Sequence, residues 1–369
     1  MNPVSRLLLK VRQKAWLRAQ ALNTRVHDLR FLYWEATLRC NLRCRHCLSS
    51  SKAKGVVSDL PAGRVVETFR DIAAHYEAGR VSIGVTGGEP LLREDLFEIL
   101  SEARHLGFPW GLATNGTLAK ERLVEKCVRT GMQSVAISLD GDETTHNWMR
   151  GDKAAYRRAW RALRLFLQAA SDTSVRVTTC VHQGNVHQLP WLRDQLRELG
   201  VHSWRLYTIS PQGRAAGSPD LWPTAEVVAK TLALVREQRR TDSTWPVSYA
   251  EDGYLGCELD HEVRDAPGYC GAGIHVGGLL ADGSYSACTS LRGPWVQGHV
   301  DELPFSEAWE SRYQVMRNRE WLRTAESCTR CRAKHECPGP SLHLWDWETG
   351  RPTLCVFDLL DNASDCQSR

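Results

Sequence analysis

Cys40-Asn-Leu-Arg-Cys44-Arg-His-Cys47 follows directly on the β-rich run Phe31–Leu38. The spacing C-x3-C-x2-C lets one loop supply three thiolates to a four-iron cluster, which leaves one iron open to a ligand with an amino and a carboxylate group. A structural zinc site normally needs a fourth protein ligand, and His46 stands awkwardly between two of the cysteines. The loop therefore predicts an iron–sulfur site rather than a zinc site.

Short β-rich runs alternate with longer helical patterns from residue 31 to residue 208, which is the order typical of βα units and a parallel sheet. The six runs are Phe31–Leu38, Val81–Val85, Trp110–Thr114, Ser134–Leu139, Val175–Val181 and Ser203–Thr208. Because six units fall short of a complete eight-unit barrel, we expect a partial (β/α)6 TIM-like barrel, an α/β fold. Loops at the C-terminal ends of the strands build the active site in such barrels, and the cysteine loop stands at such an end.

The composition divides the chain into four parts. Residues 1–30 form a basic helical segment, residues 31–215 the barrel, and residues 216–256 a connector that carries one helix, Thr224–Arg239. In residues 257–369, short segments, glycine-rich turns and clustered cysteines replace the helical periodicity. A small domain held together by metal explains this change in character.

The positive charge of the chain is concentrated at its start. The formal net charge is +4, but residues 1–30 hold seven Lys and Arg against one acid, so the remaining residues sum to −2. This balance argues against a broadly basic nucleic-acid binder. Leu7, Leu8, Val11 and Trp16 interleave with the basic residues, which predicts an amphipathic helix. Such a helix either packs on the body of the protein or makes weak contact with an anionic membrane surface or an acidic peptide leader.

The cysteine count indicates the redox environment. The chain has 13 cysteines and no recognisable export signal, which favours metal-binding thiolates over disulfides. No uninterrupted apolar run approaches the roughly 18 residues of a membrane-spanning helix. We therefore expect a cytoplasmic protein.

Five motifs in this order resemble those of the radical S-adenosylmethionine (SAM) superfamily. They are Cys40/Cys44/Cys47, Gly87-Gly88-Glu89-Pro90, Thr114-Asn115-Gly116, Ser138-Leu139-Asp140-Gly141 and Gly213-Arg214. The resemblance implies a [4Fe-4S] cluster that Cys40, Cys44 and Cys47 hold and that binds SAM. It also implies that Gly87, Gly88, Glu89 and Pro90 bind the amino group of the methionine moiety, and that Asn115, Ser138 and Arg214 lie at the SAM site. Asp140 is expected to line the cavity that faces the substrate and is the candidate catalytic residue.

The C-terminal cysteines resemble the SPASM extension of this superfamily. The pattern here is Cys270-x12-Gly283-x4-Cys288, then Cys328-x2-Cys331-x5-Cys337, and finally Cys355. The resemblance implies one complete auxiliary [4Fe-4S] cluster on Cys328, Cys331, Cys337 and Cys355, where zinc is the alternative.

A second auxiliary cluster has an incomplete set of cysteines, because Ser341 stands where the pattern has its next cysteine. Cys257, Cys270 and Cys288 are its predicted ligands. Three outcomes stay open: a cluster with one iron free for substrate, a cluster completed by Ser341, His343 or Cys366, or no cluster at this place.

The resemblance favours a peptide or protein precursor as substrate, as for a ribosomal-peptide maturase, with a flavodoxin- or ferredoxin-type reductant. A sulfatase-maturing enzyme is an alternative, although Thr289 stands where those enzymes carry Asp. Another alternative is an enzyme that acts on a small molecule such as a tetrapyrrole or another cofactor precursor. An electron-transfer or scaffold protein without SAM turnover is disfavoured by the intact cysteine loop and Glu89.

Overall fold

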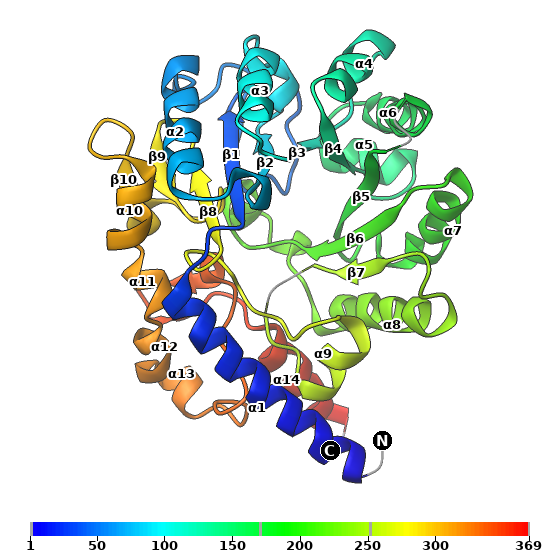
Figure 1. Ribbon diagram of the computed structural model, residues 1–369. Coiled ribbons are helices and arrows are strands. Elements are labelled where there is room, and N and C mark those ends of the chain that lie inside the picture. Colours follow the sequence, from blue (N-terminus) through cyan, green and yellow to red (C-terminus); the bar gives the residue numbers. More distant parts are fainter. Residues whose placement is uncertain (1–2, 170–171, 251–252, 368–369) are drawn as a thin grey trace.

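The computed structural model describes residues 3–169, 172–250 and 253–367. One sheet organises this part of the chain, in the order β10-β9-β8-β1-β2-β3-β4-β5-β6-β7 (Figure 1). Its strands are β1 (Phe31–Thr37), β2 (Ser82–Gly87), β3 (Trp110–Thr114), β4 (Met132–Ser138), β5 (Ser174–Val181), β6 (Ser203–Thr208), β7 (Val247–Tyr249), β8 (Val276–Leu279), β9 (Ser284–Ser286) and β10 (Gly298–His299). Strands β8 and β1 to β7 are parallel, whereas β9 and β10 are added antiparallel.

The six predicted strands are confirmed as β1 to β6, with ends that differ by at most two residues. The sequence did not predict the strands at the two edges. Strand β7 comes from the connector, and β8 to β10 come from the C-terminal part of the chain. These strands have only two to four residues, too few for a visible period of two, and the existing sheet edges supply the hydrogen-bonding partners that define them.

Helices cover the outer face of the curved sheet (Figure 1). Those beside the barrel are α2 (Ala62–His75), α3 (Leu96–His105), α4 (Glu121–Arg129), α5 (Glu143–Arg150), α6 (Ala155–Ala169), α7 (Leu189–Leu199) and α8 (Ala225–Thr241). The remaining elements are α1 (Pro3–Val26), α9 (Cys257–Val263), α10 (Phe305–Arg312), α11 (Gln314–Arg317), α12 (Glu320–Thr324), α13 (Glu326–Thr329), α14 (Val356–Gln367) and the hairpin β11 (Trp345–Asp346) with β12 (Arg351–Pro352). Helix α8 is the helix expected in the connector, and the Thr224 side chain caps its first turn.

Burial alternates along the strands and separates the two faces of the sheet. On β5, Val175 and Val177 point outward and are fully buried. Arg176 and Thr178, which alternate with them along the strand, point inward and are partly exposed. The outer core packs strand against helix, as where the rings of Trp34 and Phe69 meet edge to face at 5.7 Å. The inner face of the sheet therefore stays accessible to solvent at the level of the strands.

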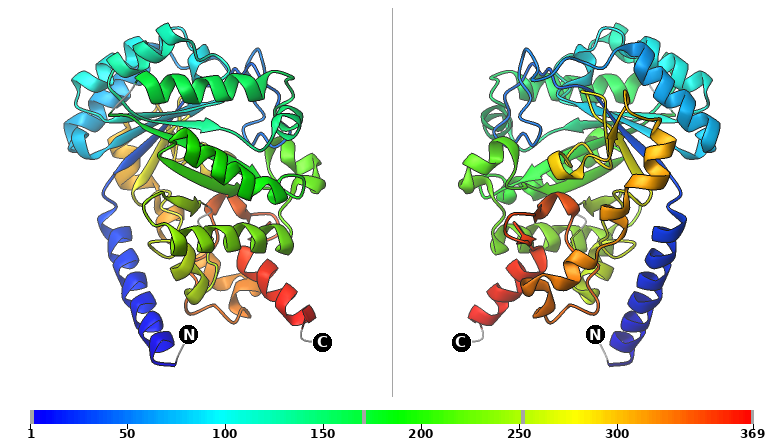
Figure 2. Two further views of the ribbon diagram at one scale, coloured as in Figure 1. Left: turned by 90° about the vertical axis from the view of Figure 1, so that its right-hand side faces the viewer. Right: turned by 90° about the vertical axis from the view of Figure 1, so that its left-hand side faces the viewer.

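Helix α1 confirms the helix predicted near the start of the chain, and it is docked on the C-terminal part. Leu9 and Gln13 are buried there, and the Gln13 amide donates a hydrogen bond to the carbonyl of Glu336 (3.0 Å). Both α1 and α14 extend away from the barrel on the same side of the molecule (Figure 2). The outward apolar side chains of α1 are more than half exposed: Leu7, Leu8 and Val11. Contact of this surface with a membrane stays a prediction. Nowhere in the described residues does a helix combine the length and apolar character needed to cross a bilayer.

A buried ion pair joins the barrel to the C-terminal part of the chain. Glu35 on β1 is fully buried, and its carboxylate pairs with the guanidinium of Arg292. The backbone N–H of Ala281 donates a second hydrogen bond to the same carboxylate (3.1 Å). Burial raises the pKa of Glu35, and Arg292 and the Ala281 N–H act against that rise. Arg292 therefore stabilises a charge that the apolar surroundings alone disfavour.

The substitution Arg292→Ala tests this link. It leaves the Glu35 carboxylate buried without its counter-charge. We expect the free energy of unfolding at pH 8 to fall by about 2–3 kcal/mol, because an unpaired buried charge is costly. The partial exposure of Arg292 keeps the loss at the lower end of the range for buried pairs. Urea unfolding measures the change. The double variant Glu35→Gln/Arg292→Ala should recover part of the loss.

The matched control is Arg312→Ala, which removes a surface pair with Glu302. We expect a change of less than about 0.5 kcal/mol for the control. An equally small effect of Arg292→Ala would show that the pair does not stabilise the junction.

Candidate active site

The cysteine loop lies at the C-terminal end of β1, as predicted, and its thiols are brought together. Cys40 and Cys44 are each 8% exposed, and Cys47 packs against them. Burial raises the pKa of the Cys40 thiol to about 11, and negative charge on Cys44, Glu89 and Cys47 adds to that rise. The three thiols therefore lie together in one cluster.

Contacts from a distant part of the barrel hold this loop in place. The Arg214 side chain donates from Nε to the carbonyl of Cys44 (2.7 Å) and from Nη1 to the carbonyl of Ser51 (2.8 Å). The Arg214 backbone N–H also donates to the carbonyl of Cys47 (3.0 Å). Arg214 therefore positions the loop, and its contact with SAM stays a prediction.

The donor set fits an iron–sulfur cluster of the kind expected. Three cysteine thiols converge from one loop, and the backbone N–H of Leu42 points at Cys40 Sγ (3.5 Å). Such N–H···S contacts are a recognised means of tuning cluster potentials. Residues Cys40, Cys44 and Cys47 would hold the cluster and leave one iron for SAM.

The Gly87-Gly88-Glu89-Pro90 turn packs directly on the start of the cysteine loop. Gly87 has φ +142°, and a Cβ atom there would lie 2.2 Å from the carbonyl oxygen of Thr37. At Gly88 a Cβ atom would lie 2.3 Å from the carbonyl oxygen of Arg39. Only glycine fits at these two positions. The close approach that the glycines permit in this structure is thus to the protein's own backbone, and Pro90 then begins the short 3-10 turn η2 (Pro90–Leu92).

Glu89 is fully buried behind this turn, and a set of donors fixes its carboxylate. The donors are the Thr114 hydroxyl (2.8 Å) and the backbone N–H groups of Asn115 (2.8 Å) and Leu91 (3.3 Å). Burial raises the pKa of Glu89 to about 7, although these hydrogen bonds act to lower it. Asn115 also links the loops through a side-chain hydrogen bond to Asn41 (3.0 Å).

The pKa of Glu89 predicts how SAM binding depends on pH. A carboxylate binds an ammonium group only when it is ionised, so raising the pH from 6 to 8 should strengthen SAM binding about tenfold. Equilibrium dialysis of the iron-loaded protein at both pH values measures this.

Glu89→Gln should bind SAM weakly and without this pH dependence, whereas the control Glu98→Gln, on the exposed side of α3, should behave like the wild type. Equal affinity of the wild type at pH 6 and pH 8 would contradict the role of Glu89.

Asp140, the candidate catalytic residue, follows the end of β4. It is fully buried, and its carboxylate accepts hydrogen bonds from Arg150 Nε (2.7 Å) and from the backbone N–H of Cys180 (3.1 Å). Burial opposes its ionisation, but the Arg150 guanidinium and His146 outweigh burial and hold the pKa of Asp140 well below its usual range. Asp140 thus contacts Arg150 and the end of β5, and its expected place facing the substrate stays a prediction.

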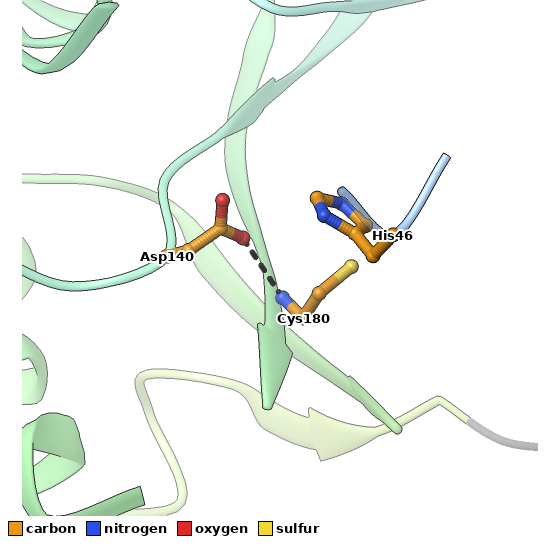
Figure 3. Close-up of side chains that lie close together, drawn as sticks. All are labelled: His46, Asp140 and Cys180. Carbon is orange, nitrogen blue, oxygen red and sulfur yellow. Dashed lines mark hydrogen bonds between the residues drawn. The ribbon is translucent and has the colours of Figure 1, made fainter. Parts of the chain in front are cut away.

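His46 of the cysteine loop lies close to Asp140 and Cys180, which come from two other segments far apart in sequence (Figure 3). Their ligand-type atoms lie within 4.8 Å of one another. Burial and the charge of Arg150 lower the pKa of His46 to about 3, so its ring is neutral. Because the Arg150 guanidinium already neutralises Asp140, a metal cation here would meet a fixed positive charge.

The sequence prediction missed Arg150 and His146 of this cluster. Arg150 Nη1 also approaches Cys44 Sγ (3.8 Å), so it connects Asp140 to the cluster loop. The available signal was the spacing of His146 and Arg150, which places them on one face of α5. Ser138 is the last residue of β4 and lies on the inner face, as its predicted contact with SAM requires.

The four cysteines predicted to hold the complete auxiliary cluster line one cavity of about 1050 Å³ in the C-terminal part of the chain: Cys328, Cys331, Cys337 and Cys355. Burial raises the pKa of the Cys337 thiol to about 12, and the other three cysteines add to the rise. Backbone N–H groups point at two of the sulfurs, from Gly339 to Cys337 (3.3 Å) and from Ala333 to Cys331 (3.4 Å). The donors fit a four-thiolate cluster.

Cys257 of the incomplete set lies near acidic side chains. Burial raises the pKa of the Cys257 thiol, and the charges of Glu336, Asp260 and Glu258 add to this rise. Ser341 is 1% exposed. The His343 ring lies 3.0 Å from the Ser210 hydroxyl, after β6. A second auxiliary cluster on Cys257, Cys270 and Cys288 stays a prediction.

Iron counting tests the complete set. Cys337→Ala should lower the iron content of the reconstituted protein by about four atoms per chain, because one cubane loses a ligand. The control Cys127→Ala removes a thiol that is buried in α4 among apolar residues, and it should leave the iron content unchanged. Unchanged iron in Cys337→Ala, or one bound zinc per wild-type chain, would contradict an auxiliary iron–sulfur cluster.

Comparison with known proteins agrees with this geometry. Residues 34–192 match the model of the radical SAM superfamily. Residues 34–192 therefore form a radical SAM domain, and the chain is similar to radical SAM enzymes.

Several relatives align over most of their length. An AdoMet-dependent heme synthase of Methanosarcina barkeri is 28% identical, over 84% of this chain and 90% of the relative. An Fe-coproporphyrin III synthase of the same organism is 28% identical, over 83% of this chain and 81% of the relative. A mycofactocin maturase of Mycolicibacterium smegmatis is also 28% identical, over 84% of this chain and 76% of the relative.

Among solved structures, native anSMEcpe with bound AdoMet and Kp18Cys peptide superimposes with a TM-score of 0.70. The match covers 92% of this chain and 98% of that one at 18% identity, so the likeness concerns the fold.

Proposed function

We propose that this radical SAM enzyme acts on a tetrapyrrole. The support comes from the relatives, since two that align over more than 80% of their own length make heme or Fe-coproporphyrin III. This ranking reverses our preference from sequence, which put a peptide or protein precursor first and gave a sulfatase-maturing enzyme and a small-molecule enzyme as alternatives.

The observation that carries the proposal is the character of the inner face of the sheet. Between β1 and β5 the residues on this face have small side chains or none: Gly84, Gly111, Ala113, Ser134 and Ala136. At the β1 side the rings of Phe31 and Tyr33 lie against each other at 4.6 Å, and a Cβ atom on Gly84 would collide with Phe31. An aromatic wall beside small residues suits a planar macrocycle.

The chemistry divides between the bound groups and the chain. A four-iron cluster with SAM supplies a 5′-deoxyadenosyl radical that takes hydrogen from an unactivated carbon. The protein holds these groups in position. Arg214 binds the backbone of the cysteine loop, and Glu89 provides a buried carboxylate. Asp140 pairs with Arg150 beside Cys44. The curved sheet presents the substrate on the inner face, at the ends of the strands that carry these residues.

A peptide or protein side chain is the second candidate substrate. The mycofactocin maturase relative supports it at the same identity as the heme synthase, 28%. An acidic electron carrier of the flavodoxin or ferredoxin type suits either function, because the cavity at the auxiliary cysteines is rich in basic side chains: Arg319, Arg323, Arg330, Arg332, Lys334 and Arg351.

Product analysis tests the function. Reduced, iron-loaded protein should convert SAM to 5′-deoxyadenosine, and Fe-coproporphyrin III should accelerate this and be consumed in step with it. Mass spectrometry follows both compounds, and Cys44→Ala is the inactive control.

No 5′-deoxyadenosine from protein with a verified full iron content would contradict the enzymatic function. Turnover of SAM that Fe-coproporphyrin III neither accelerates nor accompanies would contradict the tetrapyrrole and favour a peptide substrate.

A further inference from the structure

Two arginines stand on the inner face of the sheet, on neighbouring strands. Arg176 lies on β5 and Arg205 on β6, and the residues that flank each of them along the strand are buried on the outer face. Arg205 is aligned with Thr178, two residues after Arg176, so the two arginines are diagonal neighbours. Arg176 is partly exposed and Arg205 is exposed, so solvent and ligands reach both.

In the part of the chain that the structure describes, no carboxylate pairs with these arginines. Within residues 3–169, 172–250 and 253–367, neither forms an ion pair, and the one side-chain hydrogen bond of Arg176 is from Nε to the Ser174 hydroxyl (3.1 Å). Burial lowers the pKa of Arg176 and the positive charge of Arg205 lowers it further, whereas Tyr207 acts to raise it. The fold thus keeps two like charges close together on a partly sheltered surface, which is unfavourable unless an anion joins them.

The nearest buried carboxylates are engaged elsewhere. Glu35, also on a strand of this sheet, pairs with Arg292. Asp140 pairs with Arg150. The positive charge at Arg176 and Arg205 is therefore available to a molecule from outside.

The arginines lie within reach of the SAM site but are displaced from it. Thr178 is aligned with both Ser138 and Arg205, so Arg205 stands two strands from Ser138, or roughly 10 Å. Arg176 is four residues, about 13 Å, from Cys180 at the mouth of the barrel. A ligand that touches both the mouth and the arginines must extend over about this distance along the inner face.

We propose that Arg176 and Arg205 bind a carboxylate group of the substrate and so hold its ring against the inner face of the sheet. The assignment rests on the tetrapyrrole function proposed above and specifies how the substrate is recognised. A coproporphyrin carries carboxylates around an apolar ring, which matches two guanidinium groups on one side and the Phe31 and Tyr33 rings on the other. Arginine suits this task because its planar fork accepts a carboxylate through two parallel hydrogen bonds.

The experiment compares Arg176→Gln, Arg205→Gln and the double variant with the wild type, all as iron-loaded full-length protein. Absorbance titration measures the binding of Fe-coproporphyrin III and of its tetramethyl ester, and equilibrium dialysis measures the binding of SAM. The control is Arg236→Gln on the exposed side of α8, where Arg236 pairs with Glu262.

We expect each single variant to bind Fe-coproporphyrin III about tenfold more weakly, because each loses a charge-assisted hydrogen bond, with little change in SAM affinity. Arg205→Lys, which keeps the charge, should lose less affinity than Arg205→Gln. The ester should bind all variants alike, and Arg236→Gln should match the wild type.

Different results overturn different statements. If the wild type binds Fe-coproporphyrin III and the Gln variants bind it equally well, the arginine assignment is wrong and the tetrapyrrole function stands. If the variants lose affinity for SAM in parallel, the arginines serve the carboxylate of SAM, which also overturns the assignment. If the wild type does not bind Fe-coproporphyrin III, the proposed function and the assignment fail together.

Discussion

The rest of the structure depends on the way the cysteine loop is clamped at the end of β1. Three thiols have to converge while one side of the group stays open, and a free loop of eight residues, Cys40 to Cys47, would not hold that shape by itself. The loop is held on one side by the Gly87-Gly88 backbone against Thr37 and Arg39, and on another by Arg214. Asp140 and Arg150 complete the frame beside Cys44.

The second constraint is the strand pairing that attaches the C-terminal part of the chain to the barrel. Strand β8 pairs with β1, the strand that carries the cysteine loop, so the auxiliary region is fixed to the same element as the SAM site. The Glu35–Arg292 pair adds a buried electrostatic link at this junction. The sheet therefore ties the C-terminal part of the chain to the strand that carries the cysteine loop.

Local sequence patterns predicted the features that depend on neighbouring residues in the chain. Spacing identified the cysteine loop, and alternation with turns identified β1 to β6. Strands β7 to β10 were missed because they are too short to have a pattern and depend on pairing between distant segments. The pairing of Asp140 with Arg150 was missed because it depends on how α5 packs against the barrel. Arg176 and Arg205 follow the strand alternation, but only the register of β5 against β6 shows that the two arginines are neighbours.

The central claim is that Cys40, Cys44 and Cys47 hold a cluster whose open iron binds SAM. The most direct measurement is electron–nuclear double resonance on the reduced, iron-loaded protein with SAM labelled at its amino nitrogen and carboxylate oxygen. The account predicts hyperfine coupling from both labels in the wild type and in Cys337→Ala, and none in Cys44→Ala. Absence of coupling in wild-type protein of full iron content, or its survival in Cys44→Ala, would contradict the account.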